Sequence, residues 1–180
     1  ALASFAPDRT YYYTSLSKLM APGLRIGYVA APPGRAMDLV AGLGSTSWMT
    51  SHLSAEVASL WINDGTAEKL ASWQRKEMAR RHALVKQILA GCRYTALPTS
   101  LHVWMPVPPP WRADNFTKQA RLRGAVVTPG EVFAVGHNSA PQSIRISLGG
   151  ATASRVELEK GLHTLLEVLN GRVEPALLVM

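Results

Sequence analysis

The spacing of hydrophobic residues changes several times along the chain, and each spacing predicts a different element. Residues 10–16 and 26–30 have the aromatic and β-branched character of strands, and we expect the second strand to be buried. A short helix is expected at 34–42. Helical spacing predicts two longer helices at 48–63 and 66–90, with Asp64 and Gly65 separating them and Thr66 capping the second.

Beyond the long helix the expected elements become shorter and alternate between strand and helix. Strands are expected at 93–96, 102–106, 125–127 and 143–148, the last with alternating polar and apolar residues. Helices are expected at 113–123 and from the capping-box pair Ser154 and Glu157 to about Asn170. The pattern therefore predicts two strands, then helices, then a compact α+β unit, with a boundary near residues 66–80.

Composition and charge exclude several classes of protein. Hydrophobic residues make up 47% of the 180 residues, enough for a real core and too many for a disordered chain. The net charge of +7 is not gathered in one run, and nucleic-acid recognition motifs are absent. The densest basic stretch lies in the long helix and is expected to face solvent, although Glu77 interrupts it: Arg75, Lys76, Arg80, Arg81 and Lys86.

The single cysteine, Cys92, rules out a disulfide within the chain and fits a reducing compartment, so we expect a cytoplasmic protein. We expect Cys92 to be a small buried residue rather than a nucleophile. No apolar stretch approaches the roughly 20 residues that span a bilayer, so no membrane partner is expected. The histidines show no metal-ligand spacing, so no metal is expected either. The first residue is not Met, and we expect the chain to begin inside a longer protein.

The most informative stretch is SLSKLMAPGLRIGY, residues 15–28. Lys18 comes just after the first expected strand and before a Pro-Gly turn. Ser15 and Ser17 precede the lysine, and Arg25 follows the turn. Hydroxyl and guanidinium donors suit a phosphate, and a lysine amine attacks an aldehyde. Pyridoxal 5′-phosphate (PLP) requires both functions. The alternative is that Lys18 and Arg25 are ordinary surface charges beside a turn.

This stretch, written S-x-S-K-x-x-x-P-G-L-R-x-G-Y, resembles the PLP-lysine segment of fold type I aminotransferases. The resemblance implies that Lys18 holds PLP as a Schiff base and then moves the α-proton of the substrate as a general base. It also implies that Ser15 and Arg25 bind the cofactor phosphate, with Ser17 as an additional contact.

A second stretch, QSIRIS at residues 142–147, resembles the segment whose arginine binds the substrate α-carboxylate. The resemblance gives that role to Arg145, and a planar guanidinium matches a carboxylate in geometry. The alternative is that Arg145 is a strand residue paired with a structural acid. Trp48 and Trp104 are candidates for lining a substrate pocket, although tryptophans more often belong to the core.

The resemblance covers nearly the whole chain. At residues 101–104, 123–130 and 144–149 the sequence is most similar to the aminotransferase-like domains of MocR-type regulators in the GntR superfamily. It implies an α/β plus α+β fold, the end of a PLP-transferase large domain followed by the small C-terminal domain. Residues 1–65 would hold the last strands and helices of an incomplete large domain. Residues 66–180 would form the small α+β domain, entered through the long helix.

The resemblance implies PLP as cofactor, an amino acid or keto acid as ligand, and a homodimer. In MocR-type regulators the PLP domain senses PLP or an amino compound, and DNA is bound only through an N-terminal winged helix-turn-helix that this sequence lacks. Stand-alone aminotransferases of the aminoadipate and kynurenine type resemble the same stretch, so an enzyme that transfers an amino group between an α-amino acid and an α-keto acid is the alternative. A plain folding or dimerisation module is a third interpretation.

The resemblance fails upstream of Lys18. The family's aspartate for the pyridine nitrogen lies further before the lysine than residues 1–17 reach, and Asp8 is too close to Lys18 to serve. A carboxylate on that nitrogen strengthens the ring as an electron acceptor. We therefore expect this chain alone to be inactive as an aminotransferase and to bind PLP weakly or not at all, with the cofactor held by the longer parent.

Overall fold

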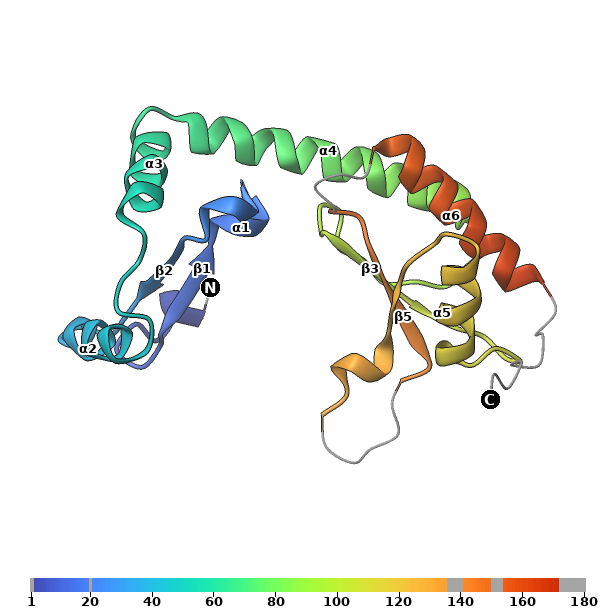
Figure 1. Cartoon of the computed structure of the whole chain (residues 1–180), viewed down its shortest axis with the longest axis horizontal. Helices are drawn as coiled ribbons and strands as arrows, with labels where there is room; N and C mark the ends of the chain where they lie inside the picture. The colour runs from blue at the N-terminus through green and yellow to red at the C-terminus, as the bar shows by residue number, and fades with distance from the viewer. Residues whose placement is uncertain (1, 20, 136–140, 150–153, 172–180) are drawn as a thin grey trace. The chain divides into compact units, whose positions relative to one another are not determined.

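A computed structural model of the chain describes residues 2–19, 21–135, 141–149 and 154–171. Figure 1 shows the chain dividing into two units, Ala1–Gln74 and Arg75–Met180, called the N-terminal unit and the C-terminal unit from here on. The division falls inside the long helix α4 (Thr66–Ile88), so one helix contributes to both units.

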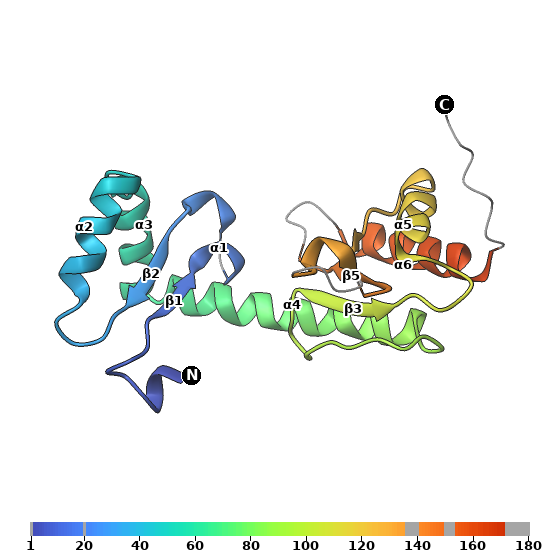
Figure 2. The ribbon, with the colours of Figure 1, turned by 90° about the horizontal axis from the view of Figure 1, so that it is seen from below.

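The N-terminal unit is built around one β-hairpin. Its elements in chain order are η1 (Leu2–Ser4), β1 (Tyr12–Ser15), α1 (Leu16–Leu19), η2 (Pro22–Leu24), β2 (Gly27–Ala30), α2 (Ala36–Thr46) and α3 (His52–Asn63), followed by the start of α4. The two strands are antiparallel, with Tyr12 opposite Ala30 and Ser15 opposite Gly27. The chain between them forms α1 and η2 and so closes one end of the hairpin (Figure 2).

The N-terminal unit buries few of its apolar residues. Leu16, Ile26 and Ala58 form its core, which joins the hairpin end to α3. Every residue of β1 and β2 is exposed, and α2 has no buried residue. The expected burial of the second strand is therefore wrong: only Ile26, just before β2, is buried, because no layer among the described residues covers the hairpin.

The C-terminal unit is a three-stranded antiparallel sheet packed against helices, with strand order β3-β5-β4. Figure 1 labels the two longer strands of this sheet, β3 and β5, and the helices α5 and α6. Its elements are the second part of α4, β3 (His102–Pro106), α5 (Ala113–Leu122), β4 (Thr128–Pro129), η3 (Gly130–Phe133), β5 (Ser143–Ser147) and α6 (Arg155–Asn170). On β5, Ile144 and Ile146 enter the core, so Arg145 between them lies on the opposite face of the sheet. The helices supply Val85, Phe116 and a stripe of leucines on α6 to the same core.

Most of the predicted elements are confirmed with shifted ends. Two expected strands are wrong. At 93–96 only Thr95 pairs, as an isolated bridge to Trp104. The strand expected at 125–127 forms later, at Thr128–Pro129, because the Ala125 N–H is already bound to the Ala120 carbonyl at 2.8 Å in closing α5.

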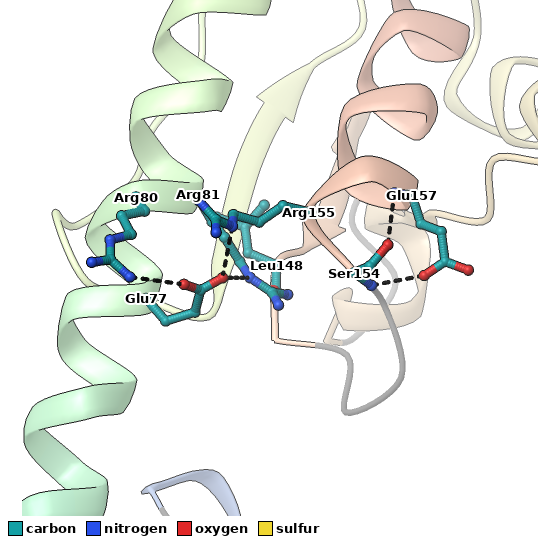
Figure 3. A network of polar contacts seen from close by, with 7 residues as sticks. All are labelled: Glu77, Arg80, Arg81, Leu148, Ser154, Arg155 and Glu157. Atoms are coloured by element: carbon teal, nitrogen blue, oxygen red, sulfur yellow. Dashed lines mark hydrogen bonds and ion pairs between the residues drawn. The ribbon is translucent and has the colours of Figure 1, made fainter.

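Local hydrogen bonds explain where the helices begin. The Ser154 and Glu157 capping box is confirmed, with both reciprocal bonds present at the start of α6 (Figure 3). Thr66, which was expected to cap α4, is instead its first residue, and its N–H donates to the Asp64 carboxylate at 2.8 Å. This bond lowers the pKa of Asp64.

The expected solvent-facing basic stretch of α4 is only partly correct. Glu77 is buried, and its carboxylate accepts a hydrogen bond from Arg81 Nε at 3.1 Å (Figure 3). Arg81 Nη1 also donates to the Leu148 carbonyl at 2.6 Å, and Arg80 and Arg155 each approach Glu77 to 3.8 Å. The Glu77 carboxylate therefore connects α4 to the first turn of α6 through Arg155. Through Arg81 it is also connected to the Leu148 carbonyl, just after β5.

Candidate functional site

Four of the predicted site residues lie on one short segment of the N-terminal unit. Ser15 is the last residue of β1, Ser17 and Lys18 lie on α1, and Arg25 lies between η2 and β2. Because the hairpin pairs Ser15 with Gly27 and α1 packs against η2, the connection brings these four residues to the same end of the hairpin.

The Ser15 hydroxyl helps to close this connection. It donates to the Ile26 carbonyl at 3.3 Å and accepts a bond from the Ser17 N–H at 3.1 Å. The same Ile26 carbonyl accepts the Leu16 N–H at 3.1 Å. The turn is thus held by its own backbone and by one serine, which leaves the longer side chains available for a ligand.

Two backbone features fit the motif that carries the resemblance. Arg25 adopts a left-handed conformation, with φ of 53° and ψ of 36°, which costs a residue with a side chain about 1–2 kcal/mol. A Cβ on Gly27 would come within 3.2 Å of the Thr14 carbonyl, so glycine suits the close approach of the strands there. Backbone strain of this kind often accompanies a binding function.

The charges at the hairpin end are positive and unpaired. Lys18 and Arg25 are exposed, and neither forms an ion pair or a side-chain hydrogen bond with any residue that the structure describes. The acids of this unit that have a partner bind elsewhere: Asp8 pairs with Arg9 at 3.5 Å and Asp38 with Arg35 at 3.1 Å. Two free cations beside hydroxyl donors form a surface that attracts an anion.

The fifth predicted residue, Arg145, belongs to the C-terminal unit. It sits at the middle of β5, opposite Trp104 on β3 and Thr128 on β4. Its guanidinium carbon lies 4.8 Å from the centre of the Phe133 ring, and Phe133 meets Trp104 edge to face at 5.7 Å. Such a cation–π contact stabilises by about 0.5–2 kcal/mol.

The alternative that Arg145 pairs with a structural acid is not supported. Across the described residues no carboxylate lies within ion-pair distance of Arg145, and its buried Nε has no hydrogen-bond partner. A buried N–H without a partner costs about 1–3 kcal/mol. An arginine retained in this state has a donor to offer to a ligand.

The remaining candidates carry no site. Trp48 is exposed, whereas Trp104 contacts the ring beside Arg145. Burial raises the pKa of the half-buried Cys92 thiol, which disfavours the reactive thiolate. No group of three metal-binding side chains occurs within the described parts of the chain, and no helix in those parts is long and apolar enough to cross a bilayer.

Sequence reasoning did not identify Phe133 or the Glu77 network. Phe133 follows the predicted Pro129-Gly130 turn, and nothing in its spacing links it to Arg145. In the sequence Glu77 interrupts a charged face, whereas in the structure it contacts Arg155 and, through Arg81, is connected to the Leu148 carbonyl, both from distant parts of the sequence.

Comparisons with known proteins agree with these features. The family described as aminotransferase class I and II matches residues 3–165. An uncharacterized HTH-type transcriptional regulator, YdeF from Bacillus subtilis, is 33% identical over 94% of this chain and 37% of its own length. The 2-aminoadipate transaminase of Thermus thermophilus is 27% identical over 89% of this chain and 41% of its own length.

Solved structures give the same answer for the fold. The α-aminoadipate aminotransferase LysN of Thermus thermophilus, complexed with N-(5′-phosphopyridoxyl)-L-leucine, aligns with a TM-score of 0.78 and 22% identity. The alignment covers 93% of this chain and 44% of that one. The chain thus spans about two-fifths of the length of the relatives it matches. The expected fold, the end of the large domain followed by the small α+β domain of an aminotransferase, is confirmed. With a family match over residues 3–165, the chain belongs to the class I and II aminotransferases.

Proposed function

We propose that this chain is the C-terminal part of a PLP-dependent, aminotransferase-like domain of a MocR-type transcriptional regulator in the GntR superfamily, which senses PLP or an amino compound. The observation that carries the proposal is the hairpin end, where the side chains of Lys18, Ser17 and Arg25 form no hydrogen bond or ion pair with the described residues. The similarity to an HTH-type regulator over 94% of the chain supports a regulator.

The donors at the hairpin end fit the chemistry of PLP. Arg25 and the hydroxyls of Ser15 and Ser17 would hold the phosphate, and Lys18 Nζ would hold the aldehyde carbon, whose oxygen leaves as water. When bound, the cofactor supplies a ring that withdraws electrons from the substrate α-carbon. Lys18 Nζ then accepts and returns the α-proton.

Arg145 binds the carboxylate of an amino acid or keto acid in this proposal. Its free Nε and its terminal nitrogens provide the parallel donors that a carboxylate accepts. The partly buried position on β5 strengthens the interaction, since fewer water molecules compete for the guanidinium.

Features of the N-terminal unit support a longer parent protein. Both faces of the β1–β2 hairpin are exposed, and a two-stranded sheet is at best marginally stable by itself. We infer that residues 1–65 complete a larger sheet domain and that 66–180 form the small domain. We place the carboxylate for the pyridine nitrogen in the longer protein, because Asp8 lies too few residues before Lys18 to serve. We further infer a cytoplasmic homodimer, and little or no PLP binding or activity in this chain alone.

A stand-alone aminotransferase is the second candidate, favoured by 27% identity to a 2-aminoadipate transaminase. Its substrates would be an α-amino acid and an α-keto acid acceptor. The two candidates differ in the sequence upstream of this chain. A winged helix-turn-helix and a linker there would decide for the regulator, and the rest of a large PLP domain without them for the enzyme.

The test is a PLP titration of the parent protein and of this chain, followed by borohydride reduction and mass mapping. We expect the parent to carry the reduced cofactor on Lys18 and the chain alone to carry little. Lys18→Ala should abolish the label in the parent, whereas Lys69→Ala, at an exposed lysine of the same unit, should leave it unchanged. Label on a different lysine of the wild-type parent would refute the assignment.

A further inference from the structure

We propose that Phe133 is a positioning residue, which fixes the plane of the Arg145 guanidinium so that its donors meet a ligand carboxylate. The inference rests on the proposed role of Arg145 in ligand binding and adds to it a residue that determines affinity. The aromatic ring lies 4.8 Å from the guanidinium carbon, well within cation–π range.

Phe133 and Arg145 come from neighbouring elements of different rigidity. Arg145 is fixed by the central strand β5, which pairs with β3 on one side and β4 on the other. Phe133 ends the 3-10 turn η3, and its side chain is 42% exposed. The ring therefore needs support from a third residue if it is to hold the guanidinium.

Trp104 provides that support. Its ring meets Phe133 edge to face, with centroids 5.7 Å apart and planes at 69°. The Trp104 backbone is itself held by two bonds with Thr95, of 2.7 and 2.9 Å, and Trp104 lies opposite Arg145 in the register of β3 and β5. The Trp104 ring thus contacts the Phe133 ring, and the Phe133 ring contacts the Arg145 guanidinium, so the three side chains form a continuous row.

An aromatic partner suits an arginine that must bind a ligand. A structural carboxylate would fix the guanidinium by occupying its donors, and would then compete with the incoming carboxylate. The face of a phenyl ring attracts the cation without using any N–H donor. Accordingly, Arg145 Nε is buried and without a partner in the described structure.

The experiment is side-chain NMR of the Arg145 Nε–Hε group in the 180-residue chain, assigned by its loss in Arg145→Lys. The ring current of Phe133 shields groups over its face, so Phe133→Leu should move the Arg145 Hε resonance downfield. Titration with propionate should show binding about two- to fivefold weaker in Phe133→Leu than in wild type. Propionamide, which lacks the charge, should bind no better to one protein than to the other.

Two variants separate positioning from stability. Phe133→Tyr keeps the ring face and should retain both the resonance and the propionate affinity. Phe116→Leu removes a ring from the fully buried core of the same unit, and should lower stability without moving the Arg145 resonance. An unchanged resonance or an unchanged propionate affinity in Phe133→Leu would overturn the inference. Neither measurement needs PLP, so a failure of cofactor attachment at Lys18 would leave this result intact.

Discussion

The two units use a similar share of apolar residues in opposite ways. The C-terminal unit gathers eighteen buried residues into one core cluster, whereas the corresponding cluster of the N-terminal unit contains three. Tyr12, Tyr13, Tyr28 and Val29 of the hairpin remain exposed. A core of this kind accounts for independent stability in the C-terminal unit, while the N-terminal unit presents faces suited to further layers.

The two units also differ in net charge. Acidic and basic residues balance over 1–74, so the whole net charge of +7 comes from residues 75–180. Yet the unpaired cations of the hairpin end belong to the N-terminal unit, which has no net charge. In the basic C-terminal unit, three arginines lie around the single carboxylate of Glu77. Net charge is therefore a poor guide to where an anion would bind, and the pairing of individual groups is a better one.

The largest expected difference is between matched leucines in the two cores. Leu162→Ala, at a residue 1% exposed on α6, should lower the free energy of unfolding by about 3–4 kcal/mol through lost burial and the cavity left behind. Leu16→Ala, in the three-residue core of the hairpin, should cost less, about 2 kcal/mol, since a small cluster can close around the change more easily. Urea unfolding followed by near-UV circular dichroism measures both. Equal losses would remove the contrast between the units.

Ion pairs give the next largest contrast. Glu77→Gln should destabilise by about 2–3 kcal/mol, because it leaves Arg81, whose side chain is as buried as that of Glu77, without its carboxylate (Figure 3). Asp38→Asn breaks a pair with Arg35 that is mostly exposed, and should change stability by less than about 0.5 kcal/mol. Thermal unfolding of both variants at two salt concentrations is the measurement. A Glu77→Gln protein as stable as wild type would show that the network carries no net stability.

The smallest effect concerns the capping box of α6. Ser154→Ala should cost about 1 kcal/mol by removing one of the two reciprocal bonds. The other bond, from the Ser154 N–H, lowers the pKa of Glu157 in the folded state. Since the folded pKa lies below the unfolded one, this stabilisation is present above about pH 4.5 and disappears as the pH falls through the lowered pKa.

Glu157→Gln isolates that titration. Glutamine keeps an acceptor for the Ser154 N–H but does not ionise, so at neutral pH the variant should lack the part of the stabilisation that depends on the charged carboxylate. The loss of stability between pH 5 and 3 should be shallower than in wild type, as measured by unfolding at each pH. An identical pH profile in the two proteins would show that Glu157 does not contribute.

The sequence was sufficient where local patterns determine the structure. The helices at α4, α5 and α6, the strands at β3 and β5, and the Ser154–Glu157 box follow from periodicity and capping. The segment around Lys18 was recognisable because its residue types and order are specific. Features that depend on distant segments were not predictable: the ion pair of Glu77 with Arg155 needs α4 and α6 to come together, and the contact of Phe133 with Arg145 needs the sheet to be assembled. The exposure of both hairpin faces was not predicted either, because apolar composition alone does not say which layers cover a strand.

The paired use of the Ile26 carbonyl has a consequence for ligand capture. This oxygen accepts both the Ser15 hydroxyl and the Leu16 amide, so it keeps one donor if the serine rotates toward an arriving anion. The exchange swaps one weak, 3.3 Å contact for a charge-assisted one, keeps the Ile26 carbonyl bonded to the Leu16 amide, and releases the Ser17 N–H from the Ser15 hydroxyl. The Ser15 hydroxyl can therefore bind an anion while the bond between the Leu16 amide and the Ile26 carbonyl keeps the turn closed.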